Sequence, residues 1–218
     1  MPSTCRILEL GCGTGQLWWH NRERLPPNWT IILSDFASGM LQAAQRQLQP
    51  CPHPFVWLRA DAQQLPLAKA SVDAIIANHM LYHVPHLPHC LAEIQRVLRP
   101  GGRLYAATNG ARHLQQLRAL HQRFGRRQNV GETTGELAFD LSNGQTHLEP
   151  WMTEVRLKRF DDALVVDEVE PLLAYMCSGL RYHEPHGVGP LRAFLEQEIA
   201  RHGAIRIDKD IGMFEAIR

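Results

Sequence analysis

The 218-residue sequence lacks a strong net charge of either sign and lacks any long apolar run. Its 23 Lys and Arg residues nearly balance 22 Asp and Glu residues, which leaves a formal net charge of +1 at pH 7. A chain so close to neutral has no global field that would draw it to nucleic acid or to anionic lipid. No apolar stretch approaches the roughly 20 residues that span a bilayer, and "MPSTCRILEL" does not follow the order of a signal peptide. We therefore predict a soluble, cytoplasmic protein without membrane insertion, whose partners are chosen by local features.

Cysteine is also scarce. The five cysteines are odd in number, scattered, and free of any C-x-x-C pair, which argues against a disulfide framework or a cysteine zinc site. The segment "HVPHLPHC" holds four metal-binding side chains, but its two prolines indicate a loop that enters a helix. Zinc sites usually pair close ligands with a distant second set, which is missing here. We predict reduced thiols and no metal site.

One basic stretch, "RALHQRFGRR" at 118–127, is a candidate for phosphate binding. It lacks the interleaved aromatic residues on which nucleic-acid bases would stack. We interpret it as a solvated helix end and do not expect nucleic acid to be a partner.

Strands and helices alternate over the first half of the sequence. Apolar runs and turn residues predict strands that mostly alternate with helices. The expected strands cover 6–10, 30–35, 54–61, 71–78 and 103–109, and the expected helices cover 15–24, 38–48 and 87–98. Such alternation predicts an open, mostly parallel sheet with helices on both faces, which is a doubly wound α/β fold.

The rhythm breaks between 125 and about 190. Two strands are expected around Asn143-Gly144 and two more around Asp161-Asp162. We predict that 125–190 is a cap inserted into a single domain covering 1–218, and that its apolar face encloses a small acceptor. The competing interpretation is that this face completes the core or forms a dimer interface. A helix over 191–202 and a hairpin turning at Lys209-Asp210 then return the chain to the sheet.

The sequence "LELGCGTGQLW" places Gly11, Gly13 and Gly15 directly after the first predicted strand. In a doubly wound sheet, ligands bind in the crevice outside the carboxyl ends of the strands. Glycine lets the backbone turn sharply and approach a ligand, while the following helix offers unpaired N–H groups. A dinucleotide site would need glycine at position 16, where Gln16 stands. The turn therefore predicts a different flat, polar ligand.

Carboxylates stand on the first strand and at the ends of the next two. Glu9 precedes the glycines, Asp35 ends the second predicted strand, and Asp61 ends the third. A carboxylate at the position of Asp35 can accept hydrogen bonds from both hydroxyls of a ribose, and Asp61 can accept one from an adenine amino group. These positions favour an adenosyl ligand.

At these residues the sequence resembles the class I S-adenosylmethionine-dependent methyltransferases of the small-molecule type. The motifs that carry the resemblance are "ILELGCGTGQL", "LSDFASGML", "RADAQQLPLAKASVDAIIANHMLYHV", "LAEIQRVLRPGGRLYAATNG" and "IRIDKDIGMFEAI". The resemblance covers about two thirds of the chain. It implies a Rossmann-like seven-stranded sheet of order 3-2-1-4-5-7-6 with strand 7 antiparallel, and S-adenosylmethionine as the cofactor.

The resemblance also implies roles for individual residues. The three glycines would pass beneath the amino-acid and ribose part of the cofactor, and Glu9 would hold the loop and orient the ammonium group. The remaining implied contacts are Asp35 with the ribose, Phe36 and Met40 with the adenine face, Asp61 and Ala62 with the adenine edge, and Asn78 with the methionine moiety.

The acceptor side is expected just past the fourth strand. His79, Tyr82 and His83 lie where the family places methyl transfer, and His83 is the candidate general base for a protonated acceptor. The alternative interpretation is that the histidine packs against its neighbours or forms a hydrogen bond with the backbone. Trp151 is predicted to line the acceptor pocket, whereas Trp18, Trp19, Trp29 and Trp57 are interpreted as core packing.

We predict transfer of a methyl group to a small organic acceptor. A homodimer is a further expectation. Two alternatives are a noncatalytic adenosyl-ligand-binding or scaffold protein and an RNA or protein methyltransferase. The residues "ANHM" stand where amide and amine methyltransferases carry a D-P-P-Y-type motif, which argues against those targets. The family usually carries a few tens of residues ahead of the glycine motif. We therefore expect that the cap at 125–190 covers the cofactor alone, that a partner chain covers it, or that the chain is a shortened relative of the family.

Overall fold

The computed structural model describes residues 3–125, 137–178 and 188–218. The chain divides into two compact units. The first contains the described residues up to Gly110 together with Leu137–Arg159 and Gly212–Arg218. The second contains the described residues of Ala111–Glu136 and Phe160–Ile211. The chain therefore leaves the first unit twice and returns to it twice.

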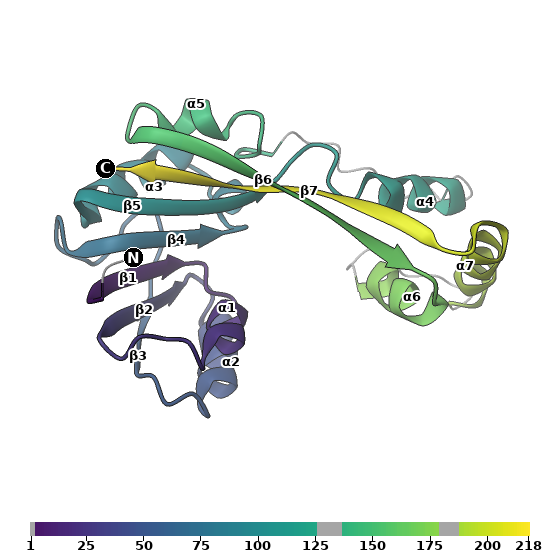
Figure 1. Cartoon of the computed structure of the whole chain (residues 1–218), viewed down its shortest axis with the longest axis horizontal. Helices are drawn as coiled ribbons and strands as arrows, with labels where there is room; N and C mark the ends of the chain where they lie inside the picture. Colours follow the sequence, from purple (N-terminus) through teal and green to yellow (C-terminus); the bar gives the residue numbers. More distant parts are fainter. Residues whose placement is uncertain (1–2, 126–136, 179–187) are drawn as a thin grey trace. The chain divides into compact units, whose positions relative to one another are not determined.

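A seven-stranded sheet has the order β3-β2-β1-β4-β5-β7-β6, which confirms the predicted order (Figure 1). Neighbouring strands from β3 across to β5 pair in parallel. The Gly101 amide donates to Arg218 O and the Arg218 amide donates to Gly102 O, so the end of β7 lies beside the beginning of β5. Strand β7 is therefore antiparallel, as predicted. The strands are β1 (Cys5–Leu10), β2 (Trp29–Asp35), β3 (Phe55–Arg59), β4 (Val72–Asn78), β5 (Leu98–Asn109), β6 (Thr153–Val166) and β7 (Ile205–Ile217).

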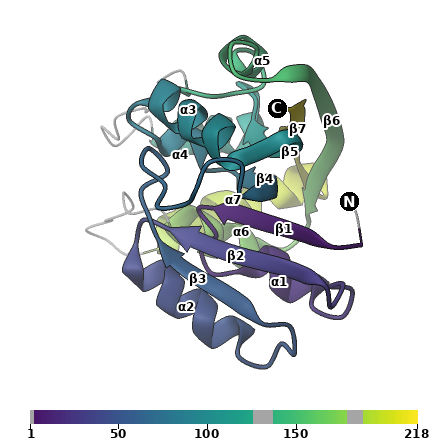
Figure 2. The same cartoon turned by 90° about the vertical axis from the view of Figure 1, so that its left-hand side faces the viewer.

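Helices cover both faces of the sheet in the first unit. Strand residues alternate between two apolar clusters, because successive side chains of a strand point to opposite faces. Ile7 and Ile31 pack with the cluster of α1 (Gln16–Asn21) and α2 (Ser38–Leu48). Leu8 packs with the cluster of α3 (Leu87–Val97). Figure 2 shows α1 and α2 on one side of the sheet and α3 on the other.

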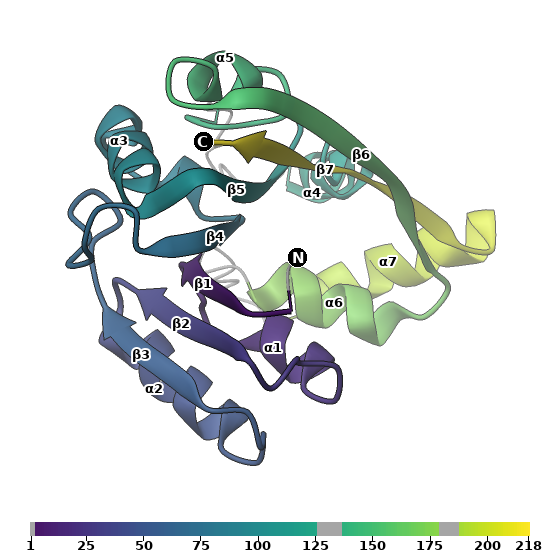
Figure 3. The same cartoon turned by 60° about the vertical axis from the view of Figure 1, so that its left-hand side comes forward.

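The second unit has a core of its own. It contains α4 (Gln115–Gly125), α6 (Val169–Ser178) and α7 (Gly189–His202), which Figure 3 shows together with the adjoining parts of β6 and β7. Leu117, Leu172 and Leu191 are buried in one apolar cluster with Ile207 of β7. Leu172 and Leu173 of the predicted cap region are thus buried within this unit, whereas Phe139 and Leu141 of the same region are buried in the core of the first unit. Residues 126–136 and 179–187 of the predicted cap region lie outside the described residues.

Three predicted turns are wrong. Asn143-Gly144 does not join two strands, because Asp140 Oδ1 accepts the Ser142 and Asn143 amides and so starts the short helix α5 (Gly144–Leu148). Asp161-Asp162 and Lys209-Asp210 lie inside the continuous strands β6 and β7. Lys209 Nζ lies 2.5 Å from Asp162 Oδ2, so these charges pair between the two strands rather than marking turns.

Candidate functional site

The turn between β1 and α1 contains three residues in the left-handed region of backbone conformation. The φ angles of Gly11, Gly13 and Gly15 are 64°, 54° and 80°. Side chains rarely adopt these angles, so glycine is the natural residue at all three positions. The Cys12 amide donates to Ser34 O over 2.9 Å, which ties the turn to the end of β2.

The three glycines differ in what surrounds them. A Cβ atom at Gly11 would lie 2.8 Å from Met80 Cβ, and one at Gly15 would lie 2.9 Å from Leu48 Cδ1. A Cβ atom at Gly13 would meet nothing within 4 Å. Packing against protein side chains therefore accounts for glycine at 11 and 15, whereas only Gly13 exposes its backbone to open space that a ligand can enter.

Asp35 is bound directly to this turn. Its Oδ2 accepts the Gly13 amide over 2.9 Å, and its Oδ1 accepts the Ala37 amide over 2.9 Å. A carboxylate has about four acceptor sites, so both oxygens retain capacity for further donors. The structure therefore brings Asp35 and Gly13 together, with free lone pairs on the carboxylate.

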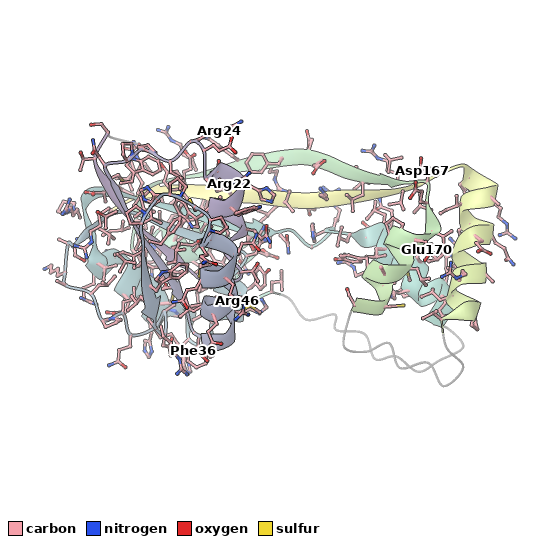
Figure 4. The ribbon with its side chains drawn as sticks, turned by 90° about the horizontal axis from the view of Figure 1, so that it is seen from below. Arg22, Arg24, Phe36, Arg46, Asp167 and Glu170 are labelled. Atoms are coloured by element: carbon pink, nitrogen blue, oxygen red, sulfur yellow. The ribbon has the colours of Figure 1, made fainter. Side chains whose placement is uncertain are left out.

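Two large apolar side chains beside Asp35 are exposed. The exposed fraction of Phe36 is 70% and that of Met40 is 46%. Figure 4 shows Phe36 at the outer margin of the first unit. Exposed apolar groups are informative where they gather beside a polar site. This arrangement offers an apolar platform next to a carboxylate.

Asp61 and Ala62 follow the neighbouring strand β3. The Ala60 amide donates to Asp35 O over 3.2 Å, which holds the ends of β2 and β3 together. Asp61 Oδ1 accepts the Gln63 amide over 2.8 Å and also the Gln63 side-chain amide. The hydrogen bond from the Gln63 backbone amide has the largest effect and, together with that from the Gln63 side chain, lowers the pKa of Asp61. The hydrogen-bond donors to the Asp61 carboxylate therefore come from Gln63, which is close in the sequence.

Glu9 is buried beneath the turn, with 3% of its surface exposed. Its Oε2 accepts the Trp18 indole N–H over 2.6 Å. Burial raises the pKa of Glu9 to about 7; the Trp18 hydrogen bond opposes this rise and the charge of Asp35 adds to it. Burial therefore disfavours the charged form of this carboxyl group, which the Trp18 indole partly restores.

The residues past β4 form the other side of the site. Asn78 ends the strand, and the His79 amide donates to Ala107 O of β5 over 2.9 Å. His79 has a φ of 52°, which is unusual for a residue with a side chain. Tyr82 and His83 follow in the 3-10 helix η1 (Leu81–His83), with ring centroids 4.4 Å apart. Tyr82 is half-buried, burial raises its pKa, and His83 is exposed.

Trp151 is the predicted site residue that the structure does not bring to these strand ends. Its carbonyl accepts the Gln95 side-chain amide over 2.7 Å, near the end of α3. Two residues later, Thr153 Oγ1 donates to Ile217 O at the end of β7. Because β7 is antiparallel, Ile217 lies at the amino ends of the parallel strands. Trp151 therefore lies beside the opposite edge of the sheet from the glycine turn, packed against the core.

Sequence reasoning missed two residues of the site. The sequence pattern predicts packing for Trp18, but its indole also donates a hydrogen bond to the Glu9 carboxylate. A buried indole N–H needs an acceptor, so a carboxylate in an apolar strand close to a buried tryptophan could have indicated this contact. Asn109 ends β5, and its buried Oδ1 has no hydrogen-bond partner among the described residues. No sequence pattern indicates such an orphan atom.

The histidine-rich segment has no metal-binding geometry of its own. The His86 and His89 rings are 5.6 Å apart, and burial raises the pKa of Cys90 to about 12. Over the described parts of the chain, no three His, Cys, Asp or Glu residues are grouped so as to hold a metal ion. No helix within those same ranges is long and apolar enough to cross a membrane.

Comparison with known proteins agrees with this geometry. Residues 8–106 match the family described as a methyltransferase domain. The chain is 35% identical over 122 residues to a malonyl-[acyl-carrier protein] O-methyltransferase of Erwinia pyrifoliae, covering 56% of this chain and 44% of the relative. It is 32% identical over 99 residues to a demethylmenaquinone methyltransferase of Symbiobacterium thermophilum, covering 44% of this chain and 39% of the relative. The chain thus spans less than half the length of these relatives.

Among solved structures, a phosphoethanolamine N-methyltransferase 2 of Haemonchus contortus in complex with S-adenosylhomocysteine shares the fold. The TM-score is 0.61 at 13% identity, covering 100% of this chain and 49% of the other. The sheet order and the glycine turn define a class I methyltransferase fold. Residues 8–106 of the chain therefore match a methyltransferase domain, and the chain shares its fold with a methyltransferase solved in complex with S-adenosyl-L-methionine.

Proposed function

We propose that the protein transfers the methyl group of S-adenosylmethionine to a small organic acceptor. The observation that carries this proposal is the grouping of Gly13, Asp35 and Glu9 at adjoining strands, with Phe36 and Met40 exposed beside them. A glycine backbone facing open space, a carboxylate with free lone pairs and an apolar platform match the amino-acid, ribose and adenine parts of the cofactor in turn.

The residues present fit this cofactor. Asp35 would accept the ribose hydroxyls, Phe36 and Met40 would contact the adenine faces, and Asp61 with the Ala62 amide would bind the adenine edge. Gly11, Gly13 and Gly15 would shape the turn beneath the ligand, while Glu9 would face the ammonium and Asn78 the methionine moiety. Support comes from the open space at Gly13, which a side chain would fill.

The chemistry asks the chain mainly for positioning. The bound cofactor supplies a sulfonium methyl group that is already electrophilic. Holding an acceptor in line with that group at near-attack distance supplies much of the acceleration. His79, Tyr82 and His83 would contact the acceptor, and exposed His83 would take a proton from an acceptor that reacts in its protonated form.

We infer a small acceptor, free or attached to a carrier, because relatives are named for malonyl-[acyl-carrier protein] and demethylmenaquinone. The near-neutral net charge favours this over a nucleic-acid substrate. A cytoplasmic location and a homodimer are further parts of the proposal. Cover for the acceptor would come from the region 125–190 of a single domain, although the apolar cluster of the second unit already accounts for much of its apolar face.

Calorimetric titration with S-adenosylmethionine, followed by turnover assays with candidate acceptors, tests this proposal. We expect binding by the parent chain and formation of S-adenosylhomocysteine with at least one small acceptor. Binding without turnover on any acceptor would instead indicate an adenosyl-ligand-binding or scaffold protein. Absence of binding would refute the proposed cofactor site.

A further inference from the structure

Glu9 and Trp18 form a buried pair across the glycine turn. Each has 3% of its surface exposed, and the indole nitrogen lies 2.6 Å from the carboxylate oxygen. Glu9 lies on β1 and Trp18 on α1, so the hydrogen bond joins the two elements that the turn connects. It is short for an N–H···O bond, as expected when the acceptor is charged.

The other groups that face Glu9 do not stabilise its charge. Asp35 at the end of β2 repels it, and Cys12 of the turn is a thiol whose pKa burial raises to about 12. The Ser34 hydroxyl donates to the Glu9 carbonyl rather than to the carboxylate. Within the described part of the chain, no Lys, Arg or His forms an ion pair with Glu9. The Trp18 indole is therefore the group that favours the charged carboxylate.

We propose that Trp18 is a positioning residue for cofactor binding: its indole N–H aims the Glu9 carboxylate beneath the turn and favours its charged form, and so sets the pH range in which the cofactor binds tightly. The inference deepens the proposed function and rests on it, since Glu9 acts on the cationic end of S-adenosylmethionine only if that ligand binds here.

The sign of the effect follows from the charges. Burial raises the pKa of Glu9 to about 7, so a large fraction is protonated near neutral pH. A cation bound beside it favours the carboxylate form, and Glu9 then gives its proton to solvent. Affinity should therefore be highest above about pH 7 and fall as the pH is lowered through that value.

Loss of the indole donor should raise this pKa further. One hydrogen bond to a carboxylate changes its pKa by about one unit. With Trp18→Phe, S-adenosylmethionine should bind about fivefold more weakly at pH 7, about tenfold more weakly at pH 6, and almost as tightly as to the parent at pH 9. A phenyl ring retains most of the contact with the surrounding cluster, which includes Phe55 at 6.2 Å.

Trp19→Phe is the matched control. Trp19 is the next residue of α1, is half-buried, and contacts the Arg22 guanidinium at 4.2 Å rather than Glu9. We expect this variant to keep the affinity and the pH profile of the parent. Glu9→Gln supplies a second control, because Trp18→Phe should have no further pH-dependent effect once the carboxylate is removed.

The experiment is calorimetric titration of S-adenosylmethionine from about pH 6 to pH 9 on the parent and these variants. A loss in Trp18→Phe that is the same at every pH, or no loss at all, would overturn the inference, because packing alone has no reason to follow protonation of Glu9.

A second measurement needs neither a ligand nor a folded variant at position 18. The indole N–H resonance of Trp18 in the parent protein should titrate with a midpoint near pH 7, identified by comparison with Trp19→Phe and Glu9→Gln. An indole resonance that does not respond between pH 5 and pH 9 would refute the coupling. Failure of the parent to bind S-adenosylmethionine, with the resonance titrating as expected, would contradict the proposed function instead.

Discussion

Each of the two units buries one glutamate, and the two are held in opposite ways. Glu9 in the first unit and Glu198 in the second both have 3% of their surface exposed. Glu198 forms an ion pair with Arg123, and Arg201 lies 4.0 Å away. Among the hydrogen bonds of the described residues, the Glu9 carboxylate accepts only that of the neutral Trp18 indole. Burying a carboxylate without a cation costs stability, so we interpret Glu9 as a residue kept for ligand binding. Glu198, which is paired with a cation, contributes to the stability of its own unit.

The same contrast extends to the other polar groups. Around the glycine turn, Asp35 and Asp61 bind backbone amides at the ends of buried parallel strands. Between strands β6 and β7, charged side chains pair with one another, as Lys158 does with Glu215 at 2.7 Å. Exposed pairs of this kind contribute about 0–1 kcal/mol. Substitutions should therefore affect ligand binding in the first group and little in the second.

The largest expected effect is that of Gly13→Val. A branched side chain would enter the open space beneath the proposed ligand, so S-adenosylmethionine binding should fall by more than about 100-fold. Gly203→Val in the second unit is the matched control, because Gly203 has a φ of 74° and equally open space around its Cβ position. Both variants should lose about 1–3 kcal/mol of stability through backbone strain, but only Gly13→Val should lose binding. Circular dichroism with calorimetric titration measures both; equal binding by the two variants would contradict the placement of the ligand.

Asp35→Ala should come next, with at least about 100-fold weaker binding of S-adenosylmethionine. It would lose two charge-assisted hydrogen bonds to the ribose, each contributing about 1.5–3 kcal/mol, and would also release the Gly13 amide. Asp61→Ala should cost about tenfold, because the adenine edge keeps a backbone partner. Asp162→Ala, which removes an exposed pair with Lys209, should leave affinity unchanged. The ribose assignment fails if Asp35→Ala binds as tightly as the parent.

Glu9→Gln should stabilise the ligand-free protein at alkaline pH. The pKa of Glu9 is raised from 4.5 to about 7 by burial, so the folded state binds its proton more tightly than the unfolded state. The cost is therefore absent below about pH 4.5, grows as the pH rises, and reaches up to about 3 kcal/mol above about pH 8. Urea denaturation of both proteins across this range would show the difference, and a constant offset at all pH values would argue against it.

The smallest effect, and of opposite sign, is expected from Glu198→Gln. This change removes the charge that Arg123 pairs with, and should destabilise the protein by about 1 kcal/mol, since Arg123 is half exposed. The affinity for S-adenosylmethionine should not change. Chemical denaturation at neutral pH provides the measurement. Stabilisation by this substitution would remove the distinction between the two buried glutamates.

The first half of the fold could be predicted because its strands are short, largely apolar runs separated by turn residues and amphipathic helices. Asp35 ends β2 and Asp61 follows β3, as those runs predict. The wrong predictions concern segments whose neighbouring residues suggest a turn that the structure does not contain. Asp161-Asp162 and Lys209-Asp210 read as turns, although cross-strand pairing keeps both strands continuous. Trp151 could not be assigned to one end of the strands from the sequence, because its place depends on contacts with Gln95 and, through Thr153, with Ile217, which are far away in the sequence.

Other features depend on contacts that no local pattern encodes. Packing by Met80 and Leu48 accounts for Gly11 and Gly15, and both partners are far away in the sequence. The Trp18 contact with Glu9 crosses the turn, so it becomes visible only once α1 folds back onto β1. Residue types at strand ends therefore predicted the class of ligand, while the reasons for individual residues needed the three-dimensional structure.

Transfer of a labelled methyl group tests the central claim most directly. The full chain would be incubated with methyl-labelled S-adenosylmethionine and, separately, with small carboxylic acids both free and carrier-bound, phenols, amines, RNA and protein extracts. We expect label on a small acceptor, an equal amount of S-adenosylhomocysteine, and at least a 100-fold lower rate at the same subsaturating cofactor concentration for Asp35→Ala. Label on RNA or protein alone, or no transfer by a chain that binds the cofactor, would contradict the account.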